Sequence, residues 1–182
     1  MTQGEEQLVI LVEALAAHGV QQHAIVRNPQ LASRLSACRN VSVGPLARSP
    51  ATAFCLMPGV DVAHAHDSRA IQTGLLLTLT RSVPYILTHR ENQLPAANAV
   101  SRCLYARAEG IVCPLFEVTA MLGNYVRDIP IDTIHDVPVS NAEKNGQRDI
   151  SRDRLSAGRM AADYLRVYRR AMDHRSVPAM LL

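Results

Sequence analysis

Residues 59–91 carry a complete β-α-β unit in one continuous stretch, and this feature restricts the chain to an α/β fold. The stretch reads GVDVAHAHDSRAIQTGLLLTLTRSVPYILTHRE: a β-type run, a charged turn, an apolar helical segment and a second β-type run. Parallel strands need such a crossover, and open α/β sheets bind ligands beyond the carboxyl ends of their strands. The first run ends in His64, His66 and Asp67, so we expect a candidate site at that edge.

Helical and β-type segments alternate along the rest of the chain. Apolar residues three and four apart predict helices over residues 4–17, 29–37, 68–80, 96–108, 115–125 and 153–172. Short β-type runs predict strands over residues 23–26, 41–43, 60–66, 85–88, 111–113 and 131–134, with a proline-punctuated loop over residues 45–58. This alternation predicts a three-layer, Rossmann-like parallel sheet with helices on both faces.

The domain organisation follows from the same pattern. We expect one Rossmann-like domain over residues 4–139, a polar linker over residues 140–153, and a terminal helix over residues 154–172 that packs back on the same domain. A chain of 182 residues is large enough to bury roughly 70% of its unfolded surface.

We expect the first central strand of such a domain to be missing, because only Met1–Gln3 precede the first predicted helix. An empty slot would leave unpaired backbone groups inside a sheet, at roughly 1–3 kcal/mol for each group. We expect that a partner chain fills the slot or that the start codon is misplaced. The apolar tail Val177–Leu182 folding back, or a rearranged sheet, is the less favoured solution.

The composition limits the classes of binding partner and the cellular compartment that we expect for this chain. The net charge of +3 accommodates anionic ligands or a membrane surface without requiring either, and the absence of Trp argues against nucleic acid. The four cysteines are spaced too irregularly for a metal or redox motif, so we expect free, buried thiols. No apolar run is long enough to span a bilayer, and the N-terminus is acidic where a signal peptide is basic. We expect a cytoplasmic protein, with contact at the inner face of the membrane left open.

His64 and His66 share a face of their predicted strand, because they are two residues apart. A zinc ion would need a third ligand near the two histidines. The available residues, His89, Glu91 and Asp67, have no spacing typical of a zinc motif, so we predict no metal site. His66 lies nearer the strand end and is the better candidate for a functional role. A hydrogen-bonded histidine with a purely structural role is an equally good interpretation of the residues alone.

Thr88–Glu91 end the next strand and are expected to line the same crevice. The candidate binding residues there are Asp67, Arg69, Thr88, His89, Arg90 and Glu91. Arg90 would meet a phosphate or a sugar hydroxyl, or else form an ion pair with Glu91 or Asp67. Gly4 opens a helix, where free amides suit an anion, although an ordinary helix cap explains it as well.

The last helix offers two interpretations. Its arginines, Arg159, Arg166, Arg169 and Arg170, would touch anionic lipid, or its apolar stripe would pack on the sheet and leave the arginines in water. We favour the second by about two to one.

Several segments resemble, in this order, the N-terminal domain of family 4 glycosyltransferases, which have the GT-B fold. They are GEEQLVILVEALAAHGV, DVAHAHDSRA, VPYILTHRE, YARAEGIVCPLFEVTAML and RMAADYLRVYRRAM, covering most of residues 4–139 and then residues 154–172. The resemblance implies that this domain holds the acceptor, that a second domain binds the nucleotide-sugar, and that the last helix crosses back onto the first domain.

The resemblance also implies roles for single residues that match the family by position. Gly4 would lie beneath the donor phosphate, and His66 would reach the transferred sugar. Thr88–Glu91 would border the acceptor cleft. The donor domain, with its paired glutamates and basic residues, has no counterpart between Ser140 and Asp153. Glu109 and Glu117 repeat the family's glutamate spacing, but they flank a predicted strand of the first domain, so we interpret the spacing as coincidence.

Two functions therefore compete. The first is the acceptor-side half of a retaining hexosyl-type transferase of cell-envelope polysaccharide synthesis. The nucleotide-sugar would be its substrate, with no further cofactor, and the acceptor would be a sugar or a lipid-linked sugar. The missing half would come from a donor-domain partner chain or a homodimer. The second is a non-catalytic binding or scaffolding protein derived from such an enzyme. A small nucleotide-binding protein is disfavoured, because no G-x-G-x-x-G run follows a strand.

Overall fold

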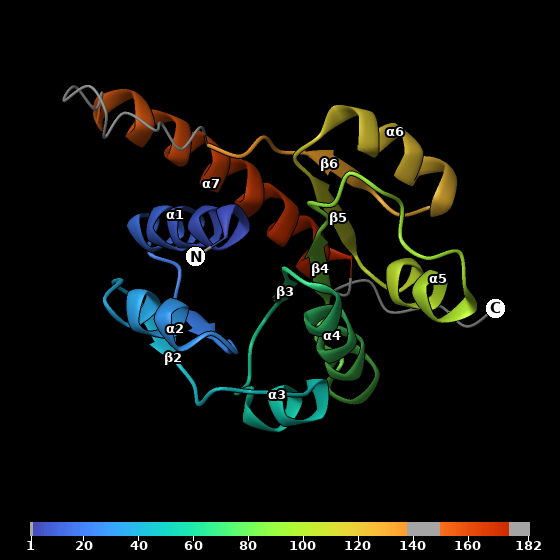
Figure 1. Ribbon diagram of the computed structural model, residues 1–182, viewed down its shortest axis with the longest axis horizontal. Coiled ribbons are helices and arrows are strands. Elements are labelled where there is room, and N and C mark those ends of the chain that lie inside the picture. The colour runs from blue at the N-terminus through green and yellow to red at the C-terminus, as the bar shows by residue number, and fades with distance from the viewer. Residues whose placement is uncertain (1, 138–149, 175–182) are drawn as a thin grey trace. The chain divides into compact units, whose positions relative to one another are not determined.

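Parallel strands alternate with helices in a computed structural model that describes residues 2–137 and 150–174 (Figure 1). The α/β class with parallel sheets is as the sequence predicts. Internal contacts divide the chain into two compact units. The first unit takes in Met1–Leu46 and His135–Leu165, and the second takes in Ala47–Ile134 and Arg166–Leu182. The expected division into residues 4–139, 140–153 and 154–172 stays a prediction.

The first unit is built on a short parallel pair of strands. Its elements are α1 (Gln3–Ala17), β1 (Gln22–Ala24), α2 (Pro29–Ser36) and β2 (Val41–Val43). β1 pairs with β2 in register Gln22↔Val41, and a cluster around Val9 and Leu35 forms the core. Thr2 and Glu5 close a capping box at the start of α1, which satisfies the first free amides of the helix.

The second unit contains a parallel sheet in the order β3-β4-β5-β6. Its strands are β3 (Ala63–Ala65), β4 (Tyr85–Thr88), β5 (Gly110–Cys113) and β6 (Ile131–Thr133). Its helices are α3 (Pro50–Leu56), α4 (Ser68–Arg81), α5 (Ala99–Ala106) and α6 (Phe116–Tyr125). α7 (Ile150–Asp173) is divided between the units at Arg166.

Helices cover both faces of this sheet (Figure 1). One face buries Tyr85, Leu87 and Ile111 against α4, α5 and α6. The last turns of α7 lie on the other face, where Val167 approaches Gly110, and Arg170 forms an ion pair with Asp132. Arg166 and Arg169 are exposed, so this part of α7 packs its apolar stripe on the sheet and keeps two of its arginines in water.

Several elements differ from the sequence prediction. α3 lies inside the expected loop over residues 45–58, because Ser49 caps the helix and Pro50 occupies its first turn. β3 is shorter than predicted, since only Ala63–Ala65 pair with β4. α7 begins at Ile150, so the last residues of the expected linker are helical, and residues 138–149 lie outside the described residues.

The cysteines are free, but their burial differs from the prediction. Only Cys113 is buried, whereas Cys38 is half-buried and Cys55 and Cys103 are exposed. The exposed pair lies on outward positions of two helices, where helical periodicity outweighs the usual preference of cysteine for the core.

The strands form two separate sheets. In the described part of the chain, β1 pairs only with β2, and β3 pairs only with β4. In a doubly wound sheet the first strand lies between the second and the fourth, and β1 and β3 correspond to those two positions. The missing first strand and what would fill its slot stay predictions, and the tail Val177–Leu182 lies outside the described residues.

Candidate functional site

His64 is the centre of a polar cluster on the α7 face of the second unit's sheet. Its Nδ1 lies 2.7 Å from the hydroxyl oxygen of Tyr168 in α7, and its Nε2 lies 2.7 Å from Oγ1 of Thr88 at the end of β4. His64 faces α7 because its neighbour Ala65 belongs to the core on the other face, and side chains alternate along a strand. The cluster thus joins β3, β4 and α7.

His66 lies against His64, just beyond the end of β3. The two ring centroids are 3.8 Å apart at an interplanar angle of 41°. Nη1 of Arg90 lies 3.3 Å from Nδ1 of His66. A guanidinium group has only donors, so Nδ1 of His66 accepts, and the ring proton of the neutral imidazole is on Nε2.

Burial and the neighbouring charge keep both histidines neutral. Burial, followed by the positive charge of Arg90, lowers the pKa of His64 to about 3. The pKa of His66 is held well below its usual value by burial first, then by His64 and Arg90. At neutral pH the cluster therefore offers two uncharged imidazoles and one guanidinium cation.

Nε2 of His66 is the donor that the cluster leaves available. It has no hydrogen-bond partner among residues 2–137 and 150–174. It is also not one of the fully buried polar atoms that lack a partner, so it keeps some exposure to solvent. A neutral N–H in this position can donate to a hydroxyl or phosphate oxygen of a ligand. It cannot remove a proton, because it already carries one.

The other residues predicted at this edge fall into two groups. Thr88 and Arg90 join the cluster, whereas His89 points to the opposite face, as alternation along a strand requires. His89 is buried, and its ring nitrogens lie 2.9 Å from the hydroxyl oxygen of Tyr105 and 2.9 Å from the carbonyl oxygen of Gln93. These contacts give His89 a structural role.

Asp67, Arg69 and Glu91 have other neighbours. Oδ1 of Asp67 accepts from the backbone amides of Arg69 and Ala70 at 2.8 Å, which caps α4. The guanidinium of Arg69 donates to the carbonyl oxygen of Arg48 at 3.2 Å. Glu91 is exposed, and its charge adds to burial in raising the pKa of Tyr105.

Gly4 belongs to the first unit. It lies in the first turn of α1, two residues after the Thr2 cap. Glu5 in the same turn accepts from Asn28 at 2.8 Å, so a carboxylate already faces the positive end of this helix.

Tyr168 belongs to the cluster, although it is not among the site residues expected from the sequence. The signal is a tyrosine within the buried stripe of α7, since a buried phenol group usually has a polar partner. Nothing in the sequence names that partner, which lies 104 residues away.

No group of three or more His, Cys, Asp or Glu residues that would suit a metal ion occurs in the described ranges. Across the same ranges, none of the helices combines the length and apolar character needed to cross a bilayer. Comparison with known proteins found no matching family model, no matching curated protein and no matching solved structure.

Proposed function

We propose that this chain is the acceptor-side half of a retaining, nucleotide-sugar-dependent glycosyltransferase and that it acts with a donor-binding partner. The observation that carries the proposal is the available Nε2–H of His66 at the carboxyl end of a parallel sheet, with Nδ1 held by Arg90. This edge is where α/β sheets bind ligands. If the chain is related to family 4 glycosyltransferases as its sequence resemblance implies, His66 would correspond by position to the histidine at the transferred sugar.

The chemistry of the cluster suits positioning. In a retaining transfer, the bond between the anomeric carbon and the leaving phosphate breaks, and a bond to the acceptor oxygen forms on the same face. The acceptor proton passes to the leaving phosphate. His66 would donate a hydrogen bond to a sugar hydroxyl, which fixes the orientation of the sugar ring. The charge on the leaving phosphate would need cations from the partner.

The donor would be a soluble nucleotide-sugar on the cytoplasmic side of the membrane, and the acceptor a sugar or a lipid-linked sugar of the cell envelope. The partner would be a donor-domain chain or a second copy of this chain.

Calorimetric titration tests the proposal. UDP-glucose, UDP-N-acetylglucosamine and GDP-mannose would be titrated into the wild-type chain, the His66→Ala variant and the matched His18→Ala variant. His18 is an exposed histidine in the first unit. Loss of one hydrogen bond predicts about 10-fold weaker binding for His66→Ala and no change for His18→Ala.

The second candidate function is a non-catalytic binding or scaffolding protein. The saturated contacts of His64 and His89 favour it, because both rings have partners at each nitrogen and serve the packing of the fold. Absence of heat with every nucleotide-sugar, together with a stable dimer in solution, would favour this function over the transferase.

A further inference from the structure

A pocket in the second unit shares no residue with the histidine cluster. It has a volume of about 450 Å³ and is formed by α5, α6 and the segments that follow β4 and α6. Its lining residues are Leu94, Arg102, Met121, Asn124, Tyr125 and Arg127. This volume is in the usual range for small-molecule sites.

The pocket concentrates positive charge. The guanidinium groups of Arg102 and Arg127 line it from different segments, and neither has an ion-pair or hydrogen-bond partner within the described part of the chain. The lining contains no carboxylate. The amide group of Asn124 adds a further donor. Two guanidinium groups and an amide around one hollow suit an anion with several oxygens.

One wall of the pocket is fixed in place. The hydroxyl group of Tyr125 donates to the carbonyl oxygen of Ala96 at 2.9 Å, and its ring meets that of Tyr105 edge-on with centroids 5.9 Å apart. Because Tyr125 is held on two sides, a ligand need not order it on binding, which lowers the entropic penalty of binding.

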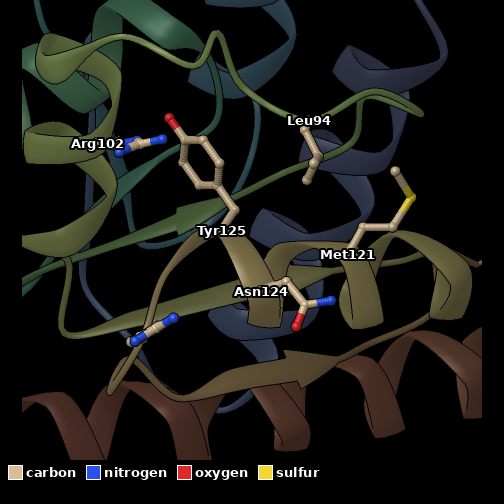
Figure 2. Close-up of a pocket in the computed structure, with 6 residues that line it drawn as sticks. Leu94, Arg102, Met121, Asn124 and Tyr125 are labelled. Atoms are coloured by element: carbon tan, nitrogen blue, oxygen red, sulfur yellow. The ribbon is translucent and has the colours of Figure 1, made fainter.

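Two apolar side chains also line the pocket. Figure 2 shows Leu94 and Met121 on one side of the Tyr125 ring and Arg102 on the other. Leu94 is 37% exposed and Met121 is 44% exposed, so both present apolar surface that a ligand can cover. The lining therefore suits a molecule with an anionic head and a short apolar part.

We propose that this pocket binds a small phosphate monoester, with the phosphate between Arg102 and Arg127 and an apolar group on Leu94 and Met121. A phosphate dianion presents three terminal oxygens and nearly two negative charges to the guanidinium groups and Asn124, whereas a carboxylate presents two oxygens and one charge. This site shares no residue with the histidine cluster and does not depend on the proposed transferase function.

The probe for the test is n-butyl phosphate. Its binding would be measured by calorimetry and by NMR of the Met121 and Leu94 methyl groups. Inorganic phosphate and n-butanol separate the two halves of the ligand, and n-butyrate replaces the phosphate by a carboxylate. The expected result is saturable binding of n-butyl phosphate with shifts at both methyl groups. Inorganic phosphate and n-butyrate should bind at least about 5-fold more weakly, and n-butanol should not bind measurably.

The variants Arg102→Gln and Arg127→Gln should each weaken n-butyl phosphate binding about 10-fold, because each removes a charge-assisted contact. Arg27→Gln and Arg39→Gln are matched controls, since both arginines are exposed and belong to the first unit. Three results would overturn the proposal: no saturable binding, equal binding by the Arg102→Gln and wild-type chains, or equal weakening by the control variants.

Discussion

The hydroxyl group of Tyr168 lies 2.7 Å from Nδ1 of His64, although 104 residues separate the two in the chain. This contact holds the last turns of α7 against β3 and fixes the ring of His64. The same ring packs on His66, so the terminal helix and the candidate binding residue belong to one polar cluster.

Tyr168→Phe should lower the free energy of unfolding by about 1–2 kcal/mol, because it removes the phenol partner of Nδ1 in the half-buried His64 ring. Urea unfolding followed by circular dichroism measures the change. Tyr125→Phe is the matched control, since its hydroxyl bond to Ala96 is exposed and its loss should have a smaller effect. A loss for Tyr168→Phe no greater than the control would contradict this account of the cluster.

Arg90 should determine the tautomer of His66. In the wild-type chain, nitrogen NMR of the imidazole rings should show the proton of His66 on Nε2, because Arg90 can only donate to Nδ1. Arg90→Met should produce a mixture of the two tautomers, and the exposed substitution Arg107→Met should leave the tautomer unchanged. A wild-type His66 with its proton on Nδ1 would refute the assignment.

Stability should fall as the pH is lowered from about 6.5, the ordinary pKa of histidine. The folded-state pKa values of His64 and His66 are both lowered, to about 3 for His64, so the unfolded chain takes up protons that the folded chain does not. Each histidine contributes a slope of up to about 1.4 kcal/mol per pH unit within this window.

Urea unfolding at pH 7.5, 6.5 and 5.5 measures this slope. The variant His66→Gln should remove about half of it, since only His64 then remains as a buried titrating ring of the cluster. Equal stability of the wild-type chain at pH 5.5 and pH 7.5 would show that the two rings are not held neutral by the fold.

Gly74→Ala should destabilise the second unit, because a Cβ atom at this position would lie 2.8 Å from Cγ of the buried Tyr85 side chain. Overpacking of this kind costs about 1–3 kcal/mol. Gly123→Ala in α6 is the control, since a Cβ atom there meets nothing within 4 Å. The control should gain about 0.5–1 kcal/mol from helix propensity, and thermal unfolding of both variants gives the comparison. Equal stability of the two variants would contradict the close packing of α4 on β4.

Much of the fold follows from local sequence pattern. The sequence predicts β2 and β4 at the residues where they occur, since short β-type runs beside turn residues are typical of strands. The sequence pattern does not predict α3, because the prolines around it are typical of a loop, although Pro50 begins the helix. The length of β3 depends on its pairing with β4, and the periodicity of the sequence does not determine that pairing.

The candidate site was predictable only in part. The rule that parallel strands end at one edge brings His66, Thr88 and Arg90 together correctly. The same rule groups His89 with them, although alternation along the strand turns His89 to the other face. Tyr168 joins the cluster through a contact across most of the chain, and no local pattern specifies it.

The measurement that tests the central claim most directly is an NMR titration of the histidine rings with a nucleotide-sugar such as UDP-glucose. The account predicts that the Nε2–H signal of His66 shifts saturably as the sugar accepts its hydrogen bond, while the signal of the exposed His18 stays constant. An unchanged His66 signal throughout a titration in which nucleotide-sugar binds elsewhere on the chain would contradict it.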